Sequence, residues 1–189
     1  TEYKRYAPIR SRLSKVIAKE LQDFQATMSR SPETLRTDGA KDYLGEVAVW
    51  RTHNPVKHDV YHRYSPWENG LCETTVQRAL YGSTCGLIDS NAPTETWHLA
   101  ARHAECVDNL IDGAYEKLYG TDKTKRMLRF VAPYGTLVTV VKEEPERDTN
   151  MGKHFGNRSF PAFLYGFHII DGHPGADVAF YKEGALHTL

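Results

Sequence analysis

The chain has 189 residues, 40% of them hydrophobic and 25% charged, which is the composition of a globular protein. Its 24 basic and 24 acidic side chains balance, so the overall basic charge typical of nucleic-acid-binding proteins is absent and only a local basic patch could serve that role. Three cysteines without CxxC spacing favour free thiols in a reducing compartment, and neither a membrane span nor a signal peptide is expected.

The first sixty residues alternate between patterns typical of strands and of helices. Residues 1–10 predict a strand that ends near Pro8, and a helix is expected from Ser11 or Ser14, because a serine there can accept the first free amide hydrogens. The predicted buried stripe of that helix is Leu13, Ile17, Leu21 and Phe24. The next predicted elements are a strand at 34–37, an amphipathic turn at 47–50 and a strand or extended segment at 56–61. A helix followed by strands in this order is typical of a layered α/β domain.

Two helices and a group of short strands are predicted in the rest of the chain. The first helix follows the turn-forming residues Pro66 and Asn69-Gly70, and its predicted buried face is Cys72, Val76, Ala79 and Leu80. The second runs from about Pro93 to Leu118 on the stripe Trp97, Ala101, Ala104, Val107, Ile111 and Ala114. Strand patterns follow at 128–131, 136–142, 160–170 and 176–181, with a polar, mobile excursion expected at 142–158.

Two carboxylates stand at positions that favour chemistry. Asp38 comes directly after the strand at 34–37, and carboxylates at strand ends of α/β folds commonly meet ligands. Glu73 shares a polar helix face with Asn69 and Gln77, because the three residues are spaced four apart. A lone glutamate on a helix is usually a solvated charge, so Glu73 gains interest only together with Asp38.

Four groups of residues occur in an order that belongs to a known family. They are Arg36-Thr37-Asp38-Gly39 with Tyr43; Ser65-Pro66 with Asn69-Gly70 and Glu73; Pro93, Trp97, Ala101, Ala104 and Asn109; and Pro133-Tyr134-Gly135 with Phe163-Leu164-Tyr165-Gly166. Together they resemble the integrases of retroviruses and retrotransposons, most closely those of copia-type elements. In this comparison Asp38 is similar to the family's second catalytic Asp and Glu73 to its catalytic Glu. The two acids are 35 positions apart, close to the family spacing.

The resemblance implies a fold, a cofactor and a reaction. The expected fold class is α/β, with a truncated RNase H-like core at 1–120, a linker at 121–127 and a small antiparallel β-barrel or sheet at 128–189. Asp38 would bridge Mg²⁺ or Mn²⁺ ions and Glu73 would bind one of them, for metal-assisted strand transfer into DNA. Lys41 and Asn69 are the expected nucleic-acid contacts. DNA is the expected partner, and the formation of a homo-oligomer stays open.

The sequence also departs from the family pattern in ways that bear on activity. The family's third carboxylate, on the first strand of its sheet, has no counterpart here, because Glu20 and Asp23 fall on a predicted helix and Glu2 lies close to the chain start. Thr74 stands where the family usually has a basic residue, and Ala40 where asparagine or glycine is commoner. We therefore expect a fragment of a retrotransposon polyprotein that is inactive, or nearly so, on its own.

Two classes of function stay open. One is this DNA-integrating enzyme fragment; the other is a non-catalytic, co-opted or degenerate nucleic-acid-binding module in which Asp38 and Glu73 are leftovers. Either would act inside the cell, in the nucleus if the host is eukaryotic.

Two further sets of side chains are considered and set aside. A zinc site is not expected, since its candidate ligands lack zinc-finger spacing. A polar loop is expected to be solvated rather than bound to phosphate. The zinc candidates are His58 with His62 and His98 with His103 and Cys106; the loop residues are Lys153, His154 and Arg158.

Overall fold

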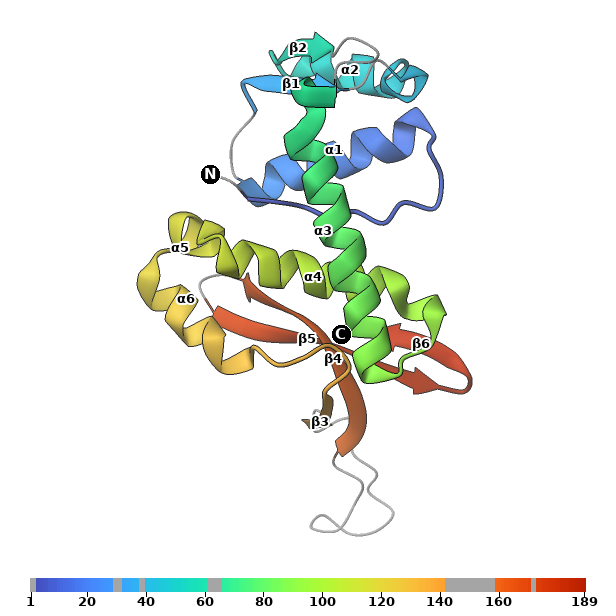
Figure 1. The fold of residues 1–189 in the computed structure, drawn as a ribbon, viewed down its shortest axis with the longest axis vertical. Coiled ribbons are helices and arrows are strands. Elements are labelled where there is room, and N and C mark those ends of the chain that lie inside the picture. The colour runs from blue at the N-terminus through green and yellow to red at the C-terminus, as the bar shows by residue number, and fades with distance from the viewer. Residues whose placement is uncertain (1–2, 29–31, 38–39, 61–65, 142–158, 171–172) are drawn as a thin grey trace. The chain divides into compact units, whose positions relative to one another are not determined.

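The computed structural model describes residues 3–28, 32–37, 40–60, 66–141, 159–170 and 173–189 (Figure 1). Its elements form two compact units, which we call the N-unit (Arg5–Leu80) and the C-unit (Thr1–Lys4 with Tyr81–Leu189). The chain passes from one unit to the other between Lys4 and Arg5, and again within helix α3 (Pro66–Ser90). Among the helices that the structure describes, none is both long and apolar enough to cross a membrane.

The N-unit is built on two parallel strands with a crossover between them. Its elements are α1 (Ser14–Met28), β1 (Thr34–Thr37), the 3₁₀ helix η1 (Lys41–Tyr43), α2 (Glu46–His53), β2 (Lys57–Val60) and the first part of α3. The register places Thr34 opposite Lys57 and Thr37 opposite Val60. Parallel strands cannot be joined by a tight hairpin, and here η1 and α2 form the connection. The core of the unit is Ala18, Val47, Trp50 and Val56.

Several expectations for the N-unit are confirmed and three are wrong. The helix from Ser14 and the strand at 34–37 are present, and β2 lies within the strand predicted at 56–61. The turn expected at 47–50 is part of a full helix, α2. The Val47 N–H in its first turn donates to Ser14 Oγ of α1 at 3.1 Å, so one of the free amide groups at the start of α2 is satisfied from another helix. Leu13 precedes α1 and is exposed instead of buried. Residues 3–13 form no strand.

The C-unit combines helices with an open antiparallel sheet. Its elements are the last part of α3, η2 (Thr94–Thr96), α4 (Trp97–Ile111), α5 (Ala114–Tyr119), α6 (Thr121–Met127), η3 (Leu128–Phe130), β3 (Leu137–Val141), β4 (Ser159–Ile170), β5 (His173–Lys182) and β6 (Ala185–Thr188). The strand order is β3-β4-β5-β6, so the expected small β domain is a sheet and not a closed barrel. Helix α4 packs along β4 (Figure 1). Phe167 of β4 is fully buried there against Cys106, Tyr115 and Met127.

The helical part of the C-unit differs from the prediction in its boundaries. The single helix expected at 93–118 is divided into α4 and α5 by Gly113, whose φ of 68° suits glycine and ends α4. Residues 121–127, expected as a linker, form α6, and the run at 128–131 is the 3₁₀ helix η3 and not a strand. Of the predicted stripe, Trp97 and Ile111 are exposed, while Leu99 and Cys106 are buried in their place. Strand β6 was not predicted.

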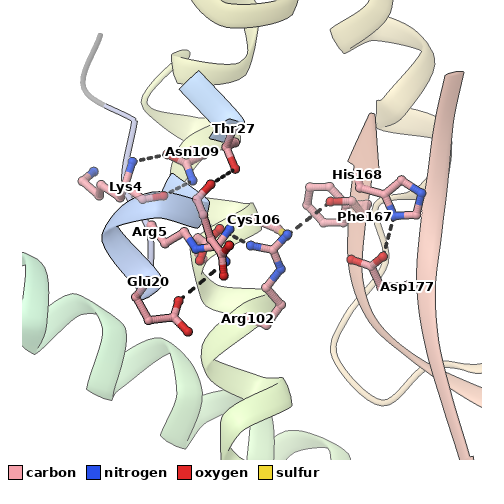
Figure 2. Close-up of polar contacts among 12 residues, drawn as sticks. Lys4, Arg5, Glu20, Thr27, Arg102, Cys106, Asn109, Phe167, His168 and Asp177 are labelled. Carbon is pink, nitrogen blue, oxygen red and sulfur yellow. Dashed lines mark hydrogen bonds and ion pairs between the residues drawn. The ribbon is translucent and has the colours of Figure 1, made fainter. Parts of the chain in front are cut away.

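Tyr3 and Lys4 join the C-unit through a buried amide. Asn109, fully buried in α4, accepts the Lys4 N–H and donates to the Lys4 carbonyl, both at 2.8 Å (Figure 2). The Lys4 ammonium pairs with Asp112, and the Tyr3 ring meets the Tyr115 ring edge-on. The Asn109 side chain therefore satisfies the backbone N–H and carbonyl of Lys4, a residue that lies in no strand.

Strands β4 and β5 are joined by a side-chain pair at a bulge. The register shifts between Leu164 and Gly166, and beyond this bulge the His168 ring is hydrogen-bonded to the Asp177 carboxylate (Figure 2). Gly175 lies opposite His168, and a Cβ there would lie 2.7 Å from His168 Nε2. The absence of a side chain at Gly175 therefore makes room for the ring.

We predict that Phe167→Ala destabilises the C-unit by about 3–5 kcal/mol, because it removes a large, fully buried side chain and leaves a cavity. Urea unfolding would measure the loss, with amide hydrogen exchange of α4 and of α1 recorded separately. Tyr181→Ala, at an aromatic position in β5 that is exposed, is the control and should cost far less. Equal losses for the two variants would contradict the packing described for Phe167.

We also predict that His103 makes the stability of the C-unit depend on pH. Its Nε2–H donates to the Ala132 carbonyl at 2.9 Å, and burial lowers its pKa below the ordinary 6.5, although this bond opposes the shift. As the pH falls, His103 of the unfolded chain therefore binds a proton before His103 of the folded chain does. The contribution of His103 to the free energy of unfolding is present above pH 6.5 and is lost below it, by at most about 1.4 kcal/mol per pH unit.

His103→Gln keeps a neutral donor and should flatten this dependence in urea titrations between pH 5 and 8, roughly the range over which histidines titrate. His98→Gln is the matched control, since His98 is exposed on the same helix. An unchanged slope in His103→Gln would show that another group is responsible.

Candidate functional site

A pocket of about 420 Å³ in the N-unit is walled by the end of β1 and by one face of α3. Arg36 and Thr37 line it from β1, and Tyr43 lines it from η1. The residues from α3 are Cys72, Glu73, Val76 and Gln77. Segments from three separate elements therefore meet at the carboxyl end of a parallel strand, which is where ligands of α/β folds commonly bind.

The spacing along α3 explains why these four residues share one face. Glu73 and Gln77 are four apart, as are Cys72 and Val76, so the helix turns a polar pair and a less polar pair toward the same side. All four are exposed. The helix thus presents a carboxylate and an amide to the pocket beside a thiol and a small apolar side chain.

One acid and one base lie on the walls of the pocket. Glu73 supplies the carboxylate and Arg36 the guanidinium. Arg36 is opposite Asp59 in the β1–β2 register, with Nε 3.8 Å from Asp59 Oδ2, and Lys57 Nζ lies 3.1 Å from Asp59 Oδ1. Asp59 therefore partly balances the two cations. Asp59 is not among the described residues that line the pocket, and Glu73 is the one carboxylate among them.

Thr37 is the best-anchored residue of the pocket. It is the only residue of β1 that is buried, with 5% of its surface exposed, and its Oγ1 lies 2.9 Å from His58 Nε2 of β2. Asp38 follows it directly in the sequence. The strand end that leads to the predicted catalytic Asp is thus held by a side-chain hydrogen bond as well as by the backbone register.

The four residues predicted for the site have different outcomes. Glu73 lines the pocket. Asp38 lies outside the described residues, and Asn69 lies within α3 with its side chain outside the described part. Lys41 is exposed in η1 and is not among the lining residues.

The local structure predicted around Glu73 needs two corrections. Pro66 and Asn69-Gly70 do not precede the helix but lie inside it, because α3 already begins at Pro66, a residue suited to a first turn. The face predicted to be buried is largely exposed, with Val76 at 53% and Leu80 at 64%. Val76 and Cys72 instead line the pocket, together with Arg36 and Thr37 at the end of β1.

The zinc candidates are not brought together. His98, His103 and Cys106 each bond to a different backbone carbonyl: those of Glu95, Ala132 and Phe167. Within the described residues there is no group of three or more His, Cys, Asp or Glu that could hold a metal ion. His62 and the loop residues Lys153, His154 and Arg158 lie outside the described residues.

Three lining residues had a signal in the sequence and others had none. Gln77 follows Glu73 by one helical turn, and Arg36 and Thr37 precede Asp38, so each could have been predicted as a neighbour of an acid. Tyr43 reaches the pocket through η1, whose path cannot be read from side-chain periodicity.

No protein-family model matches this chain, and no curated protein matches its sequence. Assignment of a function therefore depends on the residues of the pocket and on the motifs around them.

The alkylation rate of Cys72 reports on the state of the pocket, because this thiol lines it. Cys72 and Cys85 are exposed, whereas Cys106 is buried, and burial raises the pKa of its thiol, so it carries little reactive thiolate. We predict that two thiols per native chain react quickly with an alkylating reagent and the third only on unfolding, as counted by mass spectrometry. Cys72→Ser should lower the fast count to one, and rapid modification of Cys106 in the native chain would contradict its burial.

Proposed function

We propose that the N-unit is the metal-binding part of an integrase-type polynucleotidyl transferase, of the kind that copia-type retrotransposons encode. The observation that carries this proposal is that Thr37, the residue directly before Asp38, and Glu73 line the same pocket. In this proposal, two carboxylates 35 positions apart in the sequence belong to one site, one following a strand and one on a helix.

The order of the elements supports the assignment. The acid after β1 and the acid on α3 are separated by a parallel β–α–β unit, β1-α2-β2. In such a unit the carboxyl ends of both strands point to the same edge of the sheet, and polar residues placed there converge. A helix beside this edge can add a further ligand, and Glu73 of α3 lines the pocket.

The donor set suits a hard divalent cation. Mg²⁺ and Mn²⁺ prefer carboxylate, carbonyl and water oxygens, and the proposed protein ligands are the carboxylates of Glu73 and Asp38. When bound, a pair of such cations activates the attacking oxygen of a phosphodiester reaction and neutralises the leaving one. Glu73 and Asp38 would hold these cations.

The cations around the pocket suit a nucleic-acid backbone. Arg36 and Lys57 have side chains that are 63% and 74% exposed, and Lys41 is exposed on η1. Exposed Lys and Arg side chains meet phosphates and fix the register of DNA without reading its sequence. In the proposed complex Arg36 and Lys41 contact the DNA backbone, and Asn69 on α3 contacts the DNA close to Glu73.

The second candidate is a non-catalytic nucleic-acid-binding module that keeps the acids as leftovers. One observation favours it: among the described residues that line the pocket, Glu73 is the only carboxylate. Cation binding separates the two candidates, because a leftover acid needs no metal.

We predict that Mn²⁺ slows alkylation of Cys72, because an ion held by Glu73 sits beside the neighbouring thiol in the pocket wall. The rate at Cys85, also on α3 but not among the pocket-lining residues, is the internal reference and should not change. Peptide mass spectrometry of the full chain gives both rates from one sample.

Glu73→Gln and Asp38→Asn should each abolish the protection, measured for each variant as the ratio of its rates with and without metal. Asp89→Asn, at an exposed acid on the same helix, is the matched control and should behave as wild type. Protection that persists in both Glu73→Gln and Asp38→Asn would exclude this metal site. Absence of protection in the wild type would favour the non-catalytic module.

A further inference from the structure

A chain of three side chains runs from α2 through β2 to the end of β1. Arg51 Nη1 lies 2.9 Å from His58 Nδ1, and His58 Nε2 lies 2.9 Å from Thr37 Oγ1. The three residues come from different elements, and the parallel pairing of β1 with β2 brings Thr37 and His58 within reach of each other. It ends at a residue that lines the pocket.

The chemistry of the donors fixes the protonation of the ring. A guanidinium can only donate, so His58 Nδ1 must accept and carries no hydrogen. The neutral ring then carries its hydrogen on Nε2, which donates to the Thr37 hydroxyl oxygen. A charged imidazolium would point an N–H at the Arg51 donor and lose the first bond. The two hydrogen bonds therefore point the same way: Arg51 donates to His58, and His58 donates to Thr37.

The surroundings of His58 favour this neutral form. Burial, and then the positive charge of Arg51, lower the pKa of His58 below its ordinary 6.5, and Asp59 on the same strand opposes the shift. Asp59 is itself engaged by Arg36 of β1 and by Lys57 of β2. The charged groups that act on the ring are Arg51 of α2 and Asp59 of β2.

We propose that His58, held as its Nε2–H tautomer by Arg51, is a positioning residue for the pocket: it fixes the Thr37 side chain and with it the strand end that leads to Asp38. The inference rests on the proposed function in that it takes the pocket as the metal site. It adds a role for two residues, Arg51 and His58, that do not line the pocket themselves.

The tautomer is tested first, without any metal. In the full ¹⁵N-labelled chain at pH 7.5, long-range ¹H–¹⁵N correlation should show His58 with its hydrogen on Nε2 and an unprotonated Nδ1. Arg51→Met removes the donor and should release this preference, so that the Nδ1–H form becomes populated. A wild-type His58 that carries its hydrogen on Nδ1, or on both nitrogens, would overturn the relay.

The positioning role is tested by the Mn²⁺ concentration that half-protects Cys72 from alkylation. His58→Phe removes both bonds of the ring, and Thr37→Val removes the acceptor with little change of shape. Each should raise this concentration about tenfold, the usual loss when an outer-shell partner of a metal site is removed. His53→Phe, at an exposed histidine of α2 that bonds within its own helix, should leave it unchanged.

The outcomes separate this inference from the function on which it rests. Protection in the wild type with equal protection in His58→Phe and Thr37→Val would overturn the role of His58 alone. Absence of protection in the wild type would overturn the proposed metal site and this role with it, even if the tautomer is as expected. Two variants are used because either one could fail to fold, and circular dichroism identifies the one to discard.

Discussion

The parallel pairing of β1 with β2 is the constraint on which the N-unit depends. Because parallel strands require a crossover, it accounts for the presence of α2, and α2 supplies both Trp50 to the core and Arg51 to the side-chain relay. Side chains alternate along a strand, so a register shift of one residue would turn His58 away from Thr37. The hydrogen bond that anchors Thr37 in the wall of the pocket follows from this register.

The elements that could be predicted are those in which a local pattern and the packing agree. Ser14–Met28 and Thr34–Thr37 carry their signal within a few residues, and so do the cores of β4 and β5. The errors arise where packing overrides a local preference. Asn69-Gly70 reads as a loop, yet a glycine inside a helix costs only about 1 kcal/mol, and α3 continues through it. Residues 121–127 look like a linker because they are polar, although Met127 alone is fully buried and holds α6 in place.

The residue types around the pocket can be read from the sequence, but the contacts that support it cannot. An acid after a strand and an acid on a helix are visible as residue types at defined positions, and Glu73 does line a pocket. The relay behind them depends on which residue of β2 faces which residue of β1, and no periodicity gives that register. His58 was therefore considered only for a zinc pair with His62, whereas its nitrogens are engaged by Arg51 and Thr37. A histidine whose two partners come from other elements is identified by its bonds and not by its spacing.

The buried amide of Asn109 has a consequence for the order in which the chain folds. The N-unit is a continuous stretch, Arg5–Leu80, inserted into a C-unit whose two segments flank it, and the bonds between Lys4 and Asn109 span 105 positions. During synthesis at about 5–20 residues per second, Lys4 waits roughly 5–20 s for its partner to emerge. Side-chain bonds within the inserted unit span fewer positions, 33 between Ser14 and Val47 and 21 between Thr37 and His58, so these partners follow one another sooner. Lys4 is thus synthesised well before the side chain that holds its backbone in the C-unit.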